Sequence, residues 1–122
     1  MAFEKPIDLL KIRVHGHVTI ARITLENLNG NFEVERIAQK LNSLVDDGCR
    51  RIVVDLKHVK YAGSAALGML MALHKRLKEL SGHLVLSYVD NIMPVLKVSR
   101  TDRMFVTAAD PKAALELLTP KL

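Results

Sequence analysis

The sequence predicts an α/β fold: a mixed β-sheet, with an antiparallel first pair of strands and then parallel strands, packed with about four helices. Three observations predict it. Apolar and charged residues alternate over residues 10–14, and a β-rich segment follows at 17–25 after a short joint, which favours an antiparallel pair. The β-branched run at 52–56 lacks alternation, as is typical of a central strand covered on both faces. Helical and strand patterns then alternate along the chain.

Apolar spacing and cap residues place the remaining elements in order: a loop at 27–31, a helix at 32–45, a helix at 64–80, a strand at 83–89, a short helix at 91–98, a minimal strand at 104–106 and a last helix from 110. We expect Asn91 to cap the short helix, with Pro94 tolerated in its first turn. Asp110 followed by Pro111 is the usual start of a helix, an N-cap and then proline at the first helical position.

Length and composition predict one domain, spanning residues 1–122. The single cysteine, Cys49, excludes an internal disulfide and favours a reducing compartment. The longest apolar run, at 65–73, is far shorter than the roughly 20 residues that cross a bilayer, and the first residues lack an apolar signal stretch. We therefore expect a cytoplasmic domain without membrane insertion.

The net charge of +5 permits an acidic partner but does not indicate nucleic-acid binding. Proteins that bind nucleic acid usually concentrate their basic residues and interleave aromatic ones for stacking. Here the basic residues are spread from Lys5 to Lys121, and only 4% of the residues are aromatic. We expect no nucleic-acid partner.

The helix expected at 64–80 has two different faces. Its core stripe follows alternating spacings of four and three: Ala66, Leu70, Leu73, Leu77 and Leu80. The opposite side begins with small or adaptable residues and ends with charged ones: Ala65, Gly68, Met71, Ala72, Lys75 and Glu79. Two uncharged turns on an outer face suit a surface on which a partner docks. Alternatively, another element of the chain covers these turns, or the exposed alanines have no role.

The chain resembles a known family over nearly its whole length. Residues 54–68 read VDLKHVKYAGSAALG, a hydrophobic strand ending in Asp-Leu and then a helix that opens with a serine. Residues 82–86 read GHLVL and residues 95–105 read VLKVSRTDRMF. These passages, in this order, resemble the STAS domain of bacterial anti-sigma-factor antagonists.

The resemblance implies a partner and a switch. In that family a serine kinase, the anti-sigma factor, phosphorylates the serine that opens this helix, and a phosphatase reverses the modification. The matching residue is Ser64, and the resemblance implies that loop residues Asn29 and Asn31 join the partner surface with Gly63. Alternatively, this loop is an ordinary connection. Two positions depart from the family pattern: Gly63 replaces an aspartate and Ala66 replaces a glycine.

Ser64 also has a purely structural interpretation. A serine at the start of a helix can accept hydrogen bonds from the free N–H groups of the first turn, a cap worth about 1 kcal/mol. Phosphorylation would place roughly −1.5 to −2 charges beside the positive end of the helix dipole, so the helix should tolerate it while a docked partner would not.

Other candidate residues carry less information. His15 and His17 could share a face and bind a metal, but Gly16 indicates a turn and a third ligand is missing, so we expect no metal. Asp55 could act as a general base, yet nothing supplies an acid or a nucleophile, so capping or hydrogen bonding within a loop is favoured. We expect no enzyme activity, no catalytic residues and no cofactor.

The sequence thus favours an anti-sigma-factor antagonist that sequesters its partner and is switched at Ser64. The main alternative keeps the fold but makes the domain an accessory subunit that docks an ATPase of a lipid-transport ABC system, without phosphorylation. A carrier of a small apolar ligand is a third hypothesis, from a different class of function.

Overall fold

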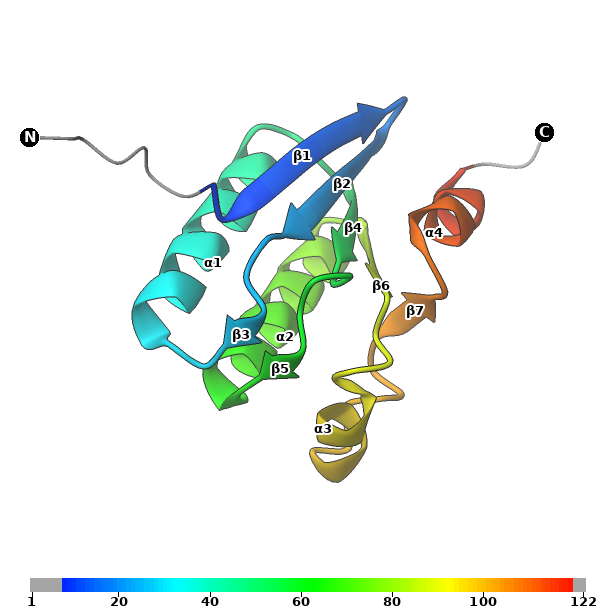
Figure 1. Cartoon of the computed structure of the whole chain (residues 1–122). Coiled ribbons are helices and arrows are strands. Elements are labelled where there is room, and N and C mark those ends of the chain that lie inside the picture. Colours follow the sequence, from blue (N-terminus) through cyan, green and yellow to red (C-terminus); the bar gives the residue numbers. More distant parts are fainter. Residues whose placement is uncertain (1–7, 120–122) are drawn as a thin grey trace, which may run out of the picture.

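The computed structural model describes residues 8–119 and contains a five-stranded mixed sheet, shown in Figure 1. In spatial order the strands are β1 (Leu10–His15), β2 (Val18–Ile23), β4 (Arg51–Asp55), β6 (His83–Ser87) and β7 (Val106–Ala108). β1 is antiparallel to β2, and every other pair in this sheet is parallel. The predicted sheet is therefore confirmed.

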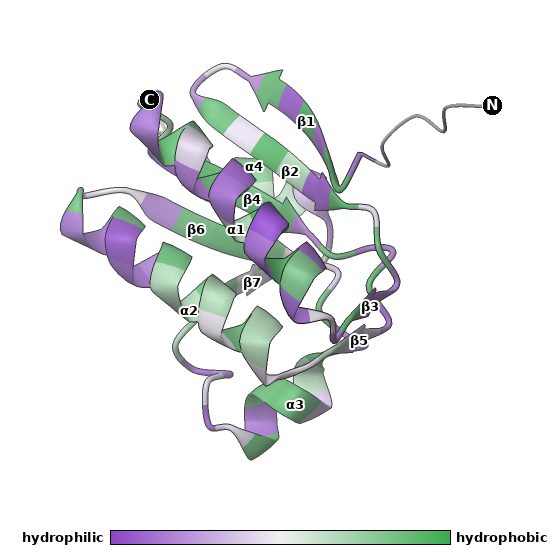
Figure 2. Cartoon of the chain, turned by 90° about the vertical axis from the view of Figure 1, so that its left-hand side faces the viewer, coloured by the Kyte–Doolittle hydropathy of each residue, from purple (hydrophilic) through white to green (hydrophobic). Residues whose placement is uncertain are grey.

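Four helices pack with the sheet: α1 (Asn31–Asp46), α2 (Ser64–Glu79), α3 (Met93–Val98) and α4 (Pro111–Leu118). α1 and α2 cover one face side by side, and α4 covers the opposite face (Figures 1 and 2). The last helix begins as predicted, because the Asp110 carboxylate accepts a hydrogen bond from the Ala113 N–H at 2.8 Å and Pro111 is its first residue. Among residues 8–119, none of the helices combines the length and the hydropathy that spanning a bilayer requires.

The centre of the core is β4. Ile52 and Val54 pack in the larger cluster under α1 and α2, while Val53 packs in the cluster under α4, and all three are fully buried. Because alternate residues of a strand point to opposite faces, a strand covered on both faces must be apolar throughout. The unbroken β-branched run has this position in the sheet, as predicted.

A second, two-stranded sheet positions the start of α2. β3 (Asn27–Leu28) pairs in parallel with β5 (Tyr61–Ala62). The sequence predicted only a loop at 27–31, because two-residue strands carry no periodic signal. This pairing brings the residues before α1 next to the residues before α2.

The alternation over residues 10–14 is typical of a half-buried strand, but this prediction is wrong for β1 beyond its first residue. Leu10 is 6% exposed, but Ile12 is 43% exposed and Val14 is 68% exposed. β1 is the edge strand of the sheet, and of its residues only Leu10 belongs to the core cluster under α1 and α2. Ile12 therefore lines an open groove with Lys40 and Leu44 of α1.

Several element ends also differ from the prediction. Leu80 is 42% exposed because it lies after the last turn of α2 and not in its core stripe. Asn91 does not cap α3: Ile92 is the N-cap, and the Asn91 side chain donates a hydrogen bond to the Val59 carbonyl at 3.2 Å. The last strand lies at 106–108 and not at 104–106, with Phe105 buried ahead of it.

Candidate functional site

The turn from β4 toward α2 is held by a buried carboxylate. Asp55, fully buried at the end of β4, accepts a hydrogen bond from the Arg22 Nε at 2.7 Å and one from the Lys57 N–H at 2.9 Å. The carboxylate thus joins β2 to the turn that leaves β4. Of the two interpretations of Asp55, this geometry favours loop hydrogen bonding, with Arg22 as a partner that the sequence did not indicate.

α2 starts at a backbone junction with the small sheet. Gly63, the N-cap, donates its N–H to the Leu28 carbonyl at 3.0 Å, and its own carbonyl accepts from the Leu67 N–H at 3.1 Å. Its φ of −85° and ψ of −175° are accessible to any residue. Because Gly63 has no side chain, the free N–H groups of the first turn receive no side-chain cap.

Ser64 is the first residue of α2 and not its N-cap, so the capping interpretation of Ser64 is wrong. The β3–β5 pairing continues to the Gly63 N–H and therefore places the cap one residue before the serine. Ser64 is exposed, and within residues 8–119 its hydroxyl makes no hydrogen bond. The hydroxyl thus stands free at the positive end of a sixteen-residue helix whose first turn contains no acidic residue.

One side of α2 is open beside Ser64. Ala65, Gly68 and Ala72 are exposed, and Met71 is half-buried against the core. A Cβ added at Gly68 would meet no described atom within 4 Å. We call these four residues the α2 outer face. Figure 2 shows this end of α2 in pale colours and its far end in purple, where Lys75, Lys78 and Glu79 lie.

The opposite side of α2 is the predicted core stripe. Ala66, Leu70, Leu73 and Leu77 are each 2% exposed or less. Ala66, one of the two departures from the family pattern, therefore lies inside the molecule and cannot contact a partner.

Asn29 lies next to Gly63. A Cβ added at Gly63 would lie 3.7 Å from the Asn29 Cα and 3.6 Å from the Leu28 carbonyl oxygen. Asn29 and Asn31 are both exposed, and Asn31 is the first residue of α1. The structure thus brings Asn29 beside the start of α2, and Asn31 follows it two residues later in the chain.

Sequence reasoning missed an aromatic side chain at this end of the molecule. Phe32 belongs to the apolar period of α1, which predicts burial, yet it is 68% exposed and the Arg36 guanidinium lies 5.7 Å from its ring centroid. Helical spacing cannot distinguish a first-turn residue that extends past the core from one that enters it. Phe32 is in the first turn of α1 and Ser64 opens α2, and the two helices begin at the same end of their layer (Figure 1).

Other candidate residues are placed elsewhere. Within residues 8–119, no three His, Cys, Asp or Glu side chains come together as a metal site. His15 ends β1, and His17 lies beyond the turn at Gly16, which has a φ of +60°. Cys49 is half-buried before β4 and accepts a hydrogen bond from the Thr19 hydroxyl, with the oxygen 3.4 Å from the sulfur.

Comparisons with known proteins agree on one family. The family model described as "Mlab, STAS domain" matches residues 8–107. BtrV of Bordetella bronchiseptica, assigned to the anti-sigma factor antagonists, is 30% identical over 91 residues, which are 74% of this chain and 78% of BtrV.

Two solved structures illustrate the likeness in fold. An anti-sigma-factor antagonist (STAS) domain protein from Planctomyces limnophilus superposes with a TM-score of 0.79 at 24% identity, over 90% of this chain and 97% of that one. SpoIIAA of Bacillus, in its unphosphorylated form, gives a TM-score of 0.70 at 17% identity, over 89% and 96% of the two chains. At identities below 25%, these two structures are evidence for the fold alone.

Proposed function

This chain belongs to the STAS domain family, and from that premise we propose that it is an anti-sigma-factor antagonist, a cytoplasmic binding module that sequesters an anti-sigma factor of the serine kinase type. The observation that carries the proposal is the free Ser64 hydroxyl at the start of α2, beside the open α2 outer face. The partner docks on this face and on the adjoining residues Gly63, Asn29 and Asn31, and it frees the sigma factor when it binds here.

The α2 outer face supplies contact area with little cost of desolvation. Ala65, Gly68 and Ala72 carry no charge, so a partner can approach the helix backbone closely without burying an unpaired polar side chain. Met71 adapts its shape to an apolar neighbour. Phe32, a large exposed aromatic residue, is of the type that contributes most at protein interfaces.

Phosphorylation of Ser64 switches this interface. Its hydroxyl makes no described hydrogen bond, so a kinase reaches it without breaking the fold. The phosphate would add roughly −1.5 to −2 charges at the helix N-terminus, where the dipole and three free N–H groups stabilise it. A neutral partner surface pressed against Ala65 and Gly68 would have to bury that charge, so the complex dissociates.

The two departures from the family pattern affect this proposal unequally. Ala66 is fully buried, so it leaves the partner surface unchanged. Gly63 stands where the family pattern has an aspartate, so the carboxylate next to the phosphorylated hydroxyl is missing. Of the two departures, this is the one that would slow recognition of Ser64 by the kinase.

The test is to identify the partner and then to challenge the pair with ATP. The full chain, used as bait in a lysate of the source organism, is expected to retain a protein with a kinase fold. Incubating the purified pair with ATP should then add one phosphate, at Ser64, and none in Ser64→Ala. Phosphate on another residue, or a partner without ATP-dependent transfer to the chain, contradicts the proposed switch.

A second function is favoured by one observation, the absence of an acidic residue ahead of Ser64. In this alternative the same α2 outer face docks an ATPase of a lipid-transport ABC system, and Ser64 is never phosphorylated. The same experiment separates the two: capture of an ABC ATPase, with Ser64 unmodified after incubation with ATP, supports the second function.

A further inference from the structure

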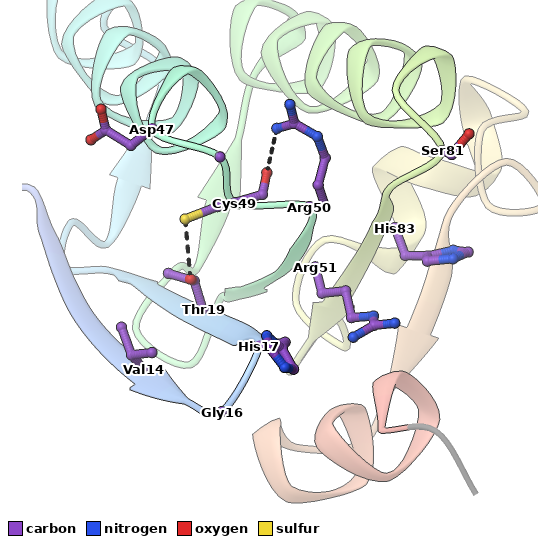
Figure 3. Close-up of a pocket in the computed structure, with 11 residues that line it drawn as sticks. Val14, Gly16, His17, Thr19, Asp47, Cys49, Arg50, Arg51, Ser81 and His83 are labelled. Atoms are coloured by element: carbon purple, nitrogen blue, oxygen red, sulfur yellow. Dashed lines mark hydrogen bonds between the residues drawn. The ribbon is translucent and has the colours of Figure 1, made fainter.

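A hollow at the opposite end of the sheet from Ser64 is lined by basic side chains. It has a volume of about 520 Å³ and lies where β2, β4 and β6 begin, whereas α2 follows the ends of the strands (Figure 3). Its lining includes His17, which precedes β2, Arg51, which opens β4, and His83, which opens β6. We call these three residues the amino-edge cluster.

The backbone fixes the cluster. Arg51 and His83 are direct partners in the parallel β4–β6 pair, and Arg51 is also opposite Val18, the residue after His17. The His83 N–H donates to the Arg50 carbonyl at 2.7 Å. This close approach requires the glycine before His83, because a Cβ on Gly82 would lie 2.5 Å from the Arg50 carbonyl oxygen.

The guanidinium charge of Arg51 is not neutralised by an ion pair with any described residue. Within residues 8–119, the ion pairs join Arg22 to Asp55, Lys60 to Glu26 and Arg76 to Asp46, so none involves the cluster. Arg50 also lines the hollow, but its guanidinium donates to the Val45 and Cys49 carbonyls. In Figure 3, His17, Arg51 and His83 lie together on the side of α4, and Asp47, a carboxylate of the lining, lies at the far side.

We propose that the amino-edge cluster binds the phosphate group of a small phosphate monoester. A guanidinium matches the oxygens of a phosphate in two parallel hydrogen bonds, and two imidazoles add donors from neighbouring strands. The volume lies within the range of small-molecule sites, about 300–1,000 Å³. The rest of the lining is mixed: Val14 and Cys49 are apolar, whereas Thr19 and Ser81 are polar, so the remainder of the molecule meets both kinds of surface.

The same residues have a structural alternative. Arg51 and His83 also line a smaller hollow with Leu117, Leu118 and Thr119 at the end of α4, where a cation stabilises the free carbonyl groups of the last turn. If this were their whole role, Arg51→Gln would lower the stability of the domain and would not alter any ligand binding.

The test is a titration of the isotope-labelled full chain, followed by ¹H–¹⁵N NMR at constant ionic strength. The probes are adenosine monophosphate, phenyl phosphate, inorganic phosphate and sodium chloride. We expect saturable shifts at residues 17, 51 and 83 with the two monoesters, and a dissociation constant raised at least about tenfold in Arg51→Gln, as is typical for loss of a charge-assisted bidentate contact. His83→Gln should weaken binding by a smaller factor.

Arg13→Gln is the matched control, because Arg13 is an exposed arginine of β1 that does not line the hollow. If Arg13→Gln and Arg51→Gln weakened monoester binding equally, the loss of affinity would come from the net charge of the chain alone, and the proposal would be overturned. Equal affinity for inorganic phosphate and for the monoesters, or equal competition by chloride, would overturn it as well. Urea unfolding of each variant separates lost binding from lost structure. Since the site is remote from Ser64, these results do not depend on the proposed function.

Discussion

Restoring a carboxylate at position 63 should stabilise the domain. The backbone of Gly63 already has the extended conformation of an N-cap, with a φ of −85° and a ψ of −175°. A Cβ there would make ordinary contacts, at 3.6 Å to the Leu28 carbonyl oxygen and 3.7 Å to the Asn29 Cα. Gly63→Asp can therefore place a carboxylate over the free N–H groups of Ala65 and Ala66 without moving the backbone.

Three contributions set the magnitude. Aspartate is a better N-cap than glycine by a few tenths of a kcal/mol. A negative charge at a helix N-terminus contributes about 0.3–1 kcal/mol. Replacing a glycine whose conformation other residues can adopt reduces the entropy of the unfolded chain, which contributes about 0.4–1 kcal/mol. Because these contributions overlap, we expect a gain of about 1 kcal/mol in the free energy of unfolding.

Urea unfolding and a thermal melt measure this gain. A change of 1 kcal/mol in a chain of this length corresponds to a rise of about 3–5 °C in the melting temperature. Gly63→Asn is the matched control, since it provides a cap without the charge, and Gly63→Ala provides neither. The expected order of stability is aspartate, then asparagine, then alanine. If the aspartate variant were no more stable than the alanine variant, the N-cap geometry described here would be wrong.

Three further predictions test other parts of the structure. Gly68→Arg should abolish partner binding, because its side chain would occupy the α2 outer face, and it should leave the melting temperature equal or higher, because that position is open. Gly68→Ala is the control and should keep binding. A loss of binding in both variants would contradict this prediction. Ser87→Ala should raise the free energy of unfolding by about 1 kcal/mol, because the buried Ser87 hydroxyl has no described hydrogen-bond partner; a loss of stability in urea would reveal a partner. Gly82→Ala should lower the free energy of unfolding by about 1–3 kcal/mol, because the new Cβ would meet the Arg50 carbonyl oxygen. An unchanged urea midpoint would contradict that close approach.

The sequence predicted the features that depend on local pattern. The β-branched run around Val53 is the central strand, Asp110 and Pro111 begin the last helix, and the stripe from Ala66 to Leu77 is buried. In each case a single segment contains the whole signal, because its period or its cap residues are set by its own geometry.

The features that the sequence did not predict depend on contacts between segments far apart in the chain. Two-residue strands such as Asn27–Leu28 exist only because the partner segment lies beside them. The bond from Arg22 to Asp55 joins residues 33 positions apart. Val14 and Phe32 are exposed because the elements that cover the core end before they reach these side chains. The spacing of apolar residues along the sequence does not indicate where this cover ends.

The candidate site was predicted in part for the same reason. The exposed side of α2 follows from helical spacing, and Ala65, Gly68 and Ala72 lie on it as expected. The start of α2 does not follow, because the pairing between Gly63 and Leu28 decides that Ser64 is the first helical residue and not the cap.

The most direct measurement of the central claim is the dissociation constant of the captured partner for the wild type and for Ser64→Glu. Ser43→Glu adds the same charge to an exposed serine of α1 and serves as the control. We expect Ser64→Glu to weaken binding at least about tenfold, a difference of about 1.4 kcal/mol, while its melting temperature stays at or slightly above the wild-type value. The affinity of Ser43→Glu should stay at the wild-type value. Equal affinity of Ser64→Glu and the wild type would contradict a switch at the start of α2.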